Sequence, residues 1–219
     1  MNKIMYVILA AAITLSAQGY YPDSDPYNPN SGRSGWGIKG GMNIAKFDGD
    51  DADGFDSKKG LVFGIFKNTP VSGTTSIQWE LLYTMKGAHF EYDYEYYYKQ
   101  VYEIDIDFNF NYLELPVLYK FNLSANSSVL PNLYIGGAAA YNIEAELEAS
   151  MDGETETEDY DYASEFEFGF IVGGGVEIPL RKGSFILDAR YNHGLTSVID
   201  EEDIEVYNRV WSFTAGYGF

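Results

Sequence analysis

The chain has 219 residues, no cysteine and a formal net charge of −19, and 17% of its residues are aromatic. The lack of cysteine excludes disulfides, thiolate catalysis and thiol-ligated metals, and the acidic balance argues against nucleic-acid binding, which needs a basic surface. The 20 tyrosines exceed what a soluble core requires and are typical of a membrane–water boundary.

The acidic residues are concentrated in a few parts of the chain. Of 33 acids, 27 lie in the segments 48–59, 87–107, 144–167 and 195–209. This pooling predicts acidic loops rather than a uniformly acidic fold.

Residues 1–19 have the pattern of a secretory signal peptide. Lys3 supplies a positive charge, a mostly apolar run of about 12 residues follows, and small residues end the segment. The run is shorter than the roughly 20 residues of a membrane-spanning helix. We expect cleavage after Ala17 or Gly19, and the sequence leaves both sites open.

Residues 20–35 contain several prolines and asparagines and show no hydrophobic periodicity. This composition predicts a disordered periplasmic leader. The remaining residues, 36–219, are expected to form a single barrel domain.

From residue 36 onward, apolar and polar side chains alternate with a period of two, which predicts β-strands. The third predicted strand is the clearest, because Trp79, Tyr83 and Met85 share one face and Glu80 and Lys86 the other. Eight such segments follow in chain order: 36–46, 61–67, 75–86, 104–121, 133–143, 166–178, 185–193 and 210–219.

The fourth predicted strand contains a change of phase. Its apolar residues occupy even positions up to Tyr112 and odd positions from Leu113 onward. One extra residue would produce this shift, so the sequence predicts a β-bulge or a change of facing at Tyr112–Leu113. Pro116 follows in mid-strand, which is unusual because proline cannot donate to a ladder.

The connections between the predicted strands alternate in length. Those after the first, third, fifth and seventh strands are long and acidic, whereas those after the second, fourth and sixth are short and contain proline. This asymmetry predicts an all-β fold, an eight-stranded antiparallel transmembrane β-barrel with short periplasmic turns and long acidic extracellular loops. The last strand ends at the C-terminus, so we expect it to close the barrel by pairing with the first strand.

A soluble barrel with its apolar face inward is the alternative architecture. The signal peptide, the loop asymmetry and aromatic residues near both ends of the apolar face favour the bacterial outer membrane. The last strand also resembles the closing strand of outer-membrane barrels, in which a terminal aromatic residue is read by the barrel-insertion machinery. The resemblance implies an insertion signal at Phe213, Tyr217 and Phe219.

With the apolar face outward, charged side chains enter the barrel. Buried charges are tolerated when they are paired and hydrogen-bonded, and an eight-stranded barrel is only wide enough for its own side chains. We therefore predict an interior ionic network in place of a solute pore or an ion path. Its members are Lys39, Glu80, Lys86, Glu114, Lys120, Glu177, Asp188 and Arg190.

Several short motifs recur in an order that resembles a known family. They lie at residues 37–43, 80–87, 112–116, 169–175 and 189–195. Together they resemble the PorT-like outer-membrane β-barrel domain family common in Bacteroidetes, over the whole chain from about Trp36. The resemblance implies the barrel and its location, and it implies no catalytic chemistry.

Catalytic candidates are few, because the chain has only two histidines. His193 has Ser197 and Ser212 in its neighbourhood, and a serine–histidine acyl-transfer pair is conceivable. Its parity with Tyr191 points it toward lipid headgroups instead, so we expect no enzymatic activity. His89 is placed in a loop.

The acidic segment 48–54 resembles a calcium loop, but its spacing fails. Counting from Asp48, Ala52 is fifth and Lys59 is twelfth, where a bidentate glutamate is required. We expect no metal site and no cofactor. The tyrosine-rich segment 92–98 is either an adhesive tip or part of a hairpin whose tyrosines pack on other loops, and we favour the hairpin.

The sequence thus predicts a monomeric, non-enzymatic outer-membrane protein that provides surface structure, adhesion or partner recognition through acidic, tyrosine-rich loops. The expected partners are outer-membrane lipid and lipopolysaccharide, the insertion machinery and an unidentified protein at the loops, without nucleic acid. Two alternatives stay open: an accessory component of a secretion or envelope-assembly complex, and a lipid-modifying enzyme that uses His193.

Overall fold

The structure, a computed structural model, describes residues 35–71, 74–96, 100–123, 128–151, 154–201 and 204–219, with the side chains of 92–103 excepted. The predicted signal peptide and nearly all of the predicted leader lie outside the described residues. Gly35, assigned to the leader, already belongs to the first strand. No helix in the described segments is long and apolar enough to cross a membrane.

The described part of the chain folds entirely into strands and their connections. In chain order the strands are β1 (Gly35–Asp48), β2 (Asp56–Pro70), β3 (Thr75–Tyr96), β4 (Gln100–Asn122), β5 (Leu130–Met151), β6 (Glu154–Asp159), β7 (Phe166–Pro179), β8 (Ser184–Gly194) and β9 (Tyr207–Gly218).

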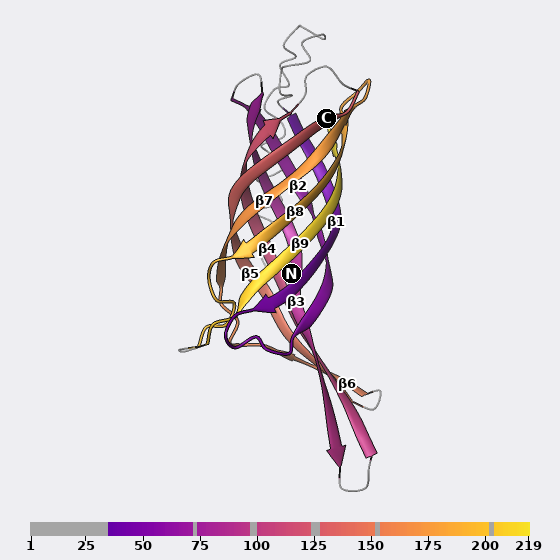
Figure 1. Cartoon of the computed structure of the whole chain (residues 1–219), viewed down its shortest axis with the longest axis vertical. Coiled ribbons are helices and arrows are strands. Elements are labelled where there is room, and N and C mark those ends of the chain that lie inside the picture. The colour runs from indigo at the N-terminus through magenta and orange to yellow at the C-terminus, as the bar shows by residue number, and fades with distance from the viewer. Residues whose placement is uncertain (1–34, 72–73, 97–99, 124–127, 152–153, 202–203) are drawn as a thin grey trace.

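Eight of these strands form a closed antiparallel barrel (Figure 1). The order around the sheet is β4-β3-β2-β1-β9-β8-β7-β5, and β4 also pairs with β5, which completes the ring. The sixth strand, β6, pairs with the end of β5 outside this ring. The eight-stranded antiparallel barrel predicted from the sequence is therefore confirmed.

The barrel closes between the first and last strands, as their sequences predict. β1 and β9 pair from Gly37 opposite Gly218 to Asp48 opposite Tyr207. Beyond the Gly37–Gly218 pair, the backbone N–H of Phe219 donates to the carbonyl of Trp36 at 2.9 Å. Closure leaves no free edge on either strand.

The wall of the barrel has an apolar outer face and a largely polar inner face. Side chains such as Ile38, Trp79 and Phe168 are about half exposed on the outside, at 55%, 52% and 50%. Aromatic pairs lie on the same outer face, including Phe63 with Tyr83 and Tyr191 with Trp211, each with ring centroids 5.1 Å apart. This is the inverse of a soluble protein and suits hydrocarbon surroundings.

The predicted change of facing in β4 at Tyr112–Leu113 is wrong, whereas a β-bulge is found next to this point, in the pairing of β4 with β5. The pairing with β3 continues through this point in one register, with Thr84 opposite Tyr112 and Tyr83 opposite Leu113. Even-numbered residues of β4, such as Phe110 and Tyr112, are buried on the inside, like Glu114 farther along. The apparent change of phase arises because the lining of the barrel itself changes from apolar to charged.

A register shift does occur beside this point, but the extra residue is on β5. Asn111 pairs with Glu144 and Tyr112 with Asn142, so Ile143 is passed over. Pro116 interrupts the other ladder, because the β3–β4 pairing lacks the position opposite it.

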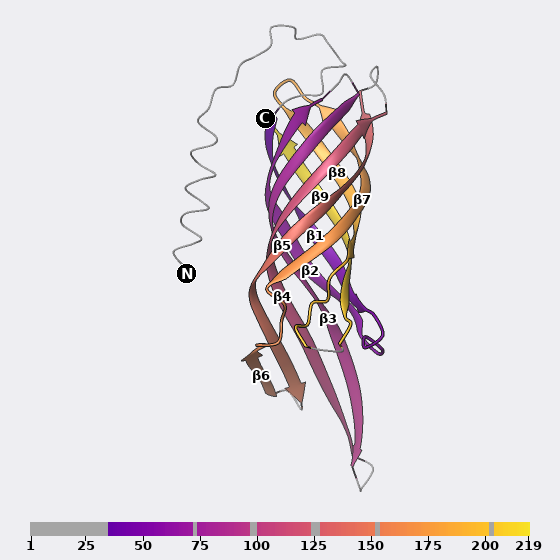
Figure 2. The same ribbon diagram turned by 90° about the vertical axis from the view of Figure 1, so that its left-hand side faces the viewer.

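Two connections expected to be loops are largely strands. β3 and β4 have 22 and 23 residues and stay paired from Thr75–Phe121 to Tyr96–Gln100. β5 likewise extends to Met151 and turns back as β6. Figures 1 and 2 show the β3–β4 hairpin projecting beyond the barrel at the end opposite the C-terminus, which we call the hairpin end. The hairpin interpretation of segment 92–98 is consistent with this backbone; its side chains lie outside the described residues.

Candidate functional site

The interior of the barrel contains a charged cluster that joins strands from opposite walls. Glu80 of β3 lies 2.9 Å from Lys39 of β1 and 2.7 Å from Arg190 of β8. Gln78 also donates to Glu80 Oε1, at 2.5 Å. All these side chains are buried, so the charges are paired inside the barrel and shielded from water.

A second cluster lies next to it. Lys86 is 2.9 Å from Glu114 and 3.2 Å from Glu167, and Asn208 donates to the other oxygen of Glu167 at 2.8 Å. Arg190 Nη2 lies 3.9 Å from Glu114 and so links the two clusters. The ammonium of Lys86 also sits over the ring of Tyr112, 4.8 Å from its centroid.

The structure places the eight predicted interior residues as follows. Lys39, Glu80, Lys86, Glu114 and Arg190 form the two clusters, and Asp188 lies 3.7 Å from Lys39. Lys120 is buried and donates to Gln78 at 3.3 Å. Glu177 is only half-buried, and among the described residues no cation lies within 4 Å of it.

Glu167 takes part in the network although it was not selected from the sequence. It was counted among the acids of segment 144–167, although it also lies in the predicted strand 166–178. Its position between the outward-facing Phe166 and Phe168 was the available signal, because neighbours in a strand point to opposite faces.

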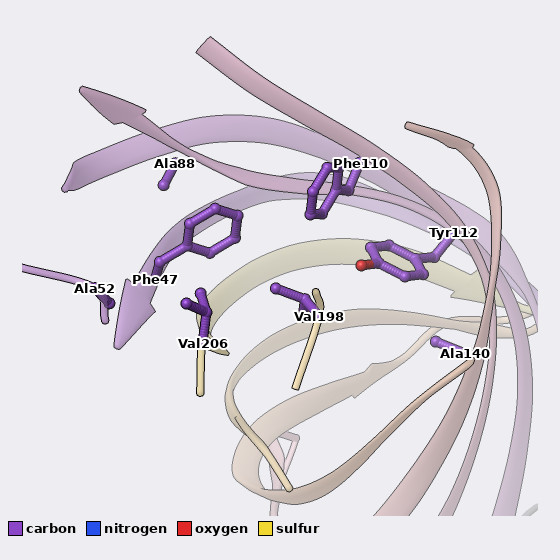
Figure 3. Close-up of a cluster of buried hydrophobic side chains, with 8 residues drawn as sticks. All are labelled: Phe47, Ala52, Ala88, Phe110, Tyr112, Ala140, Val198 and Val206. Atoms are coloured by element: carbon purple, nitrogen blue, oxygen red, sulfur yellow. The ribbon is translucent and has the colours of Figure 1, made fainter. Parts of the chain in front are cut away.

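Beyond the charges, the hairpin end of the barrel is filled by an apolar plug (Figure 3). It contains Phe47, Phe110 and Tyr112 from the barrel wall, with Phe47 and Phe110 ring centroids 5.7 Å apart. Its buried members are Phe47, Ala52, Ala88, Phe110, Tyr112, Ala140, Val198 and Val206.

The plug unites the wall with connections that look polar in sequence. Ala52 comes from the β1–β2 connection, and Val198 and Val206 come from the β8–β9 connection. Ser197 Oγ ties the latter connection together by donating to the carbonyl of Ile199 at 3.0 Å. These apolar residues were not identified as core residues from the sequence, because they are isolated among acidic residues.

The serine–histidine pair considered from the sequence is not assembled. His193 is exposed on the outside of β8, whereas Ser212 is buried on the inside of β9. Ser197 bonds to the backbone of its own connection. An acyl-transfer pair needs the serine and histidine side chains within hydrogen-bond reach. His193 and Ser212 point to opposite faces of the barrel wall, and this prevents such a contact.

The acidic β1–β2 connection is held by the backbone of another connection. Asp51 Oδ2 accepts from the N–H of Glu205 at 2.9 Å, and Ala52 is buried in the plug. Metal-ligating side chains within the described residues converge elsewhere, at His89, Glu91 and Asp105.

His89 lies on the β3–β4 hairpin in an acidic setting. Its Nδ1 is 3.0 Å from Asp107 Oδ1, and its Nε2 is 3.3 Å from Glu91 Oε1 and 3.8 Å from Asp105 Oδ1. Burial acts to lower the pKa of His89, but the hydrogen bonds to Asp107 and Glu91 outweigh it and raise that pKa. Burial likewise acts to raise the pKa of Asp107, and hydrogen bonds from Lys58 and His89 lower it overall.

The three residues of the expected insertion signal lie along the outside of β9 and just beyond it. Phe213 is 46% and Phe219 64% exposed. Tyr217 is half-buried and donates its hydroxyl proton to the carbonyl of Lys182 in the β7–β8 turn.

Comparison with known families gives one match. The model of the family described as outer membrane protein beta-barrel domain matches residues 17–200. None of the curated proteins compared with this chain matches it.

Several solved structures are similar at low sequence identity. Ail, the attachment invasion locus protein of Yersinia pestis, is 18% identical, with 85% of this chain and 100% of that chain covered and a TM-score of 0.40. Neisserial surface protein A is 16% identical over 85% and 98%, with a TM-score of 0.47. OprG from Pseudomonas aeruginosa is 12% identical over 85% and 96%, with a TM-score of 0.42.

Proposed function

This chain belongs to the outer membrane protein beta-barrel domain family. We propose that it is a non-enzymatic surface protein that recognises a partner through its projecting hairpins. The observation that carries the proposal is the length of β3 and β4, 22 and 23 residues. A tilted strand needs only about 9–11 residues to cross the outer membrane. About half of each strand is therefore available outside the membrane.

The filled interior supports recognition over transport. The two charged clusters and the apolar plug occupy successive levels of the barrel. A barrel of eight strands has no room for a solute path beside such side chains. The hairpins are the parts that extend beyond the barrel, and in outer-membrane proteins the loops on a rigid barrel are the most variable and most often functional segments.

The hairpins also indicate the chemistry of the partner. Segment 87–107 carries six acids, segment 144–165 carries ten, and β6 has the sequence ETETED with every side chain exposed. Such a surface attracts a basic protein or peptide and repels acidic ones. We place the hairpin end outside the cell, because long connections face outward in this class of barrel.

The experiment is a matched pair of hairpin deletions in cells that display the full chain. Phe90 and Ile106 are directly opposite each other, so an Asn-Gly turn can join them without disturbing the barrel below. The second variant shortens the β5–β6 hairpin, which carries the other acids of the proposed surface. Attachment of cells to surfaces coated with basic proteins should fall on loss of the β3–β4 tip, at unchanged amounts of heat-modifiable barrel. Equal attachment by both variants and the intact chain would refute this function.

The two alternatives have their own readouts. A stoichiometric protein that co-purifies with both deletion variants would favour an accessory of a secretion or envelope-assembly complex. Loss of a lipid modification in His193→Ala would favour a lipid-modifying enzyme. The narrower resemblance to PorT-like barrels, the signal peptide cleaved after Ala17 or Gly19, and the contacts with lipopolysaccharide remain parts of this proposal.

The aromatic residues of the last strand suit a role as the signal for insertion of the barrel. Phe213 and Phe219 display their rings on the outside of the closing strand and just past its end, where insertion machinery has access to them. Phe219 makes one backbone hydrogen bond to β1. It is 64% exposed, so the side chain contributes little to the folded barrel and suits a role as a recognition signal.

A further inference from the structure

The β3–β4 hairpin carries a group of side chains that the interior network and the plug do not use. His89 and Asp107 are directly opposite each other across the two strands, and so are Glu91 and Asp105. Residues two apart in a strand point to the same face, so the four side chains form a rectangle on one face of the hairpin. We propose that His89, Glu91 and Asp105 bind one divalent transition-metal ion, for which their chemistry favours zinc.

The distances suit coordination by three side chains. His89 Nε2 lies 3.3 Å from Glu91 Oε1 and 3.8 Å from Asp105 Oδ1, and the three ligand atoms all lie within 4.8 Å of one another. Zinc bonds of about 2.0–2.2 Å place two tetrahedral ligands roughly 3.3–3.6 Å apart. A small rotation of the exposed carboxylates closes the remaining gap.

Asp107 supplies an independent observation that points to a metal. Its Oδ1 is 3.0 Å from His89 Nδ1, and an ionised carboxylate can only accept, so Nδ1 is the donor. Nε2 is thereby left facing Glu91 and Asp105. This is the carboxylate–histidine arrangement that orients imidazole ligands in zinc sites. Lys58 holds Asp107 in turn, at 2.8 Å.

The position of Glu91 directly opposite Asp105 also supports a bound cation. Like charges directly opposite each other in an antiparallel ladder are destabilising. A divalent cation between these carboxylates would turn the repulsion into attraction. Among the described residues, the acids of segment 48–54 do not bring three ligand atoms together in this way, and Asp51 instead accepts from the N–H of Glu205.

The ligand set selects the class of ion. Calcium and magnesium prefer all-oxygen surroundings, whereas one imidazole and two carboxylates suit zinc and related ions. Three protein ligands leave a fourth position for water or for a group from another molecule. The site does not depend on the hairpin being adhesive, so it can be tested separately.

The test is calorimetric titration of zinc into the full chain folded in detergent micelles, with any purification histidine tag removed. We expect saturable uptake of one zinc per chain and an X-ray absorption spectrum with one imidazole among nitrogen and oxygen ligands. His89→Ala should abolish saturable uptake, and Glu91→Gln and Asp105→Asn should each weaken it. The matched controls Glu156→Gln and His193→Gln remove an exposed acid and the other histidine, and they should leave it unchanged.

Asp107→Asn tests the orienting role separately. Loss of such a partner lowers metal affinity by about 10–100-fold, while the ligands seen by X-ray absorption should stay the same. Uptake of several ions per chain that survives His89→Ala would overturn the site in favour of diffuse screening by acidic loops. No uptake above the controls would also overturn it and would leave His89 as an ion-pair partner of the acids.

Discussion

Arg190 of β8 reaches across the barrel to Glu80 of β3, with Nη1 2.7 Å from Oε2. The two strands are not neighbours in the sheet, since β2, β1 and β9 separate them along one side of the ring. The pair therefore braces opposite walls through the interior. Both side chains are at most 3% exposed, so the bond is shielded from water and salt.

Removing one member of this pair should be costly. Arg190→Met leaves Glu80 and Glu114 with one cation fewer, and a broken buried pair costs about 3–5 kcal/mol. The free energy of unfolding can be measured in urea with the protein in lipid vesicles. Arg181→Met, in the exposed β7–β8 turn, is the matched control and should have little effect. A cost equal to that of the control would show that the brace does not stabilise the barrel.

The apolar plug should contribute to stability at the hairpin end. Phe110 is fully buried, and Phe110→Ala should cost about 3–5 kcal/mol because it leaves a cavity among packed rings. Tyr162→Ala removes an exposed ring that touches only the edge of the cluster through Tyr160, so its cost should be much smaller. Similar values for both would mean that the plug is too loosely packed to matter.

Gly173 is required by the ring of Tyr134. A Cβ at Gly173 would lie 2.5 Å from Tyr134 Oη and 2.7 Å from Arg190 Cβ. Gly173→Ala should therefore destabilise the barrel by about 1–3 kcal/mol through overpacking. Gly137→Ala is the control, because its Cβ would meet its nearest neighbour at an ordinary 3.5 Å. The free energy of unfolding of both variants, measured in urea in lipid vesicles, tests this prediction. An unchanged stability of Gly173→Ala would contradict the close packing of Tyr134 against Gly173.

The terminal residue should affect assembly in cells more than the stability of the folded barrel. Phe219 is 64% exposed and contributes one backbone hydrogen bond. Phe219→Ser should lower the amount of heat-modifiable protein in the outer membrane, while refolding in detergent stays normal. Phe219→Tyr keeps an aromatic ring and should restore assembly. A refolding defect as large as the defect in cells would assign Phe219 to stability instead of recognition.

Much of the architecture follows from local patterns. The alternation along the segments 75–86 and 210–219 predicted strands with one apolar face, and the alternating connections predicted a closed, eight-stranded outer-membrane barrel, as found. Extended backbone has a side-chain period of two, so a dozen residues suffice to show which face meets lipid.

The site was harder to predict, because it depends on residues brought together from distant strands. Glu167 was grouped with an acidic segment although it lies in a predicted strand, and it forms an ion pair with Lys86. Phe108 and Phe110 suggested a change of facing in β4, yet Phe110 belongs to the plug and Phe108 packs against it. The plug also contains Val198 and Val206, which come from a connection far along the chain.

The facing of the strands and the closure of the last strand on the first could be derived from local patterns. Which charges pair and how far the hairpins extend became clear only from the folded barrel. Faces follow from the local period of the backbone, whereas pairing across the barrel depends on strand register and tilt. His89 shows the difference: its sequence neighbours place it on a polar loop, and only the register of β3 with β4 sets it opposite Asp107 and beside Asp105.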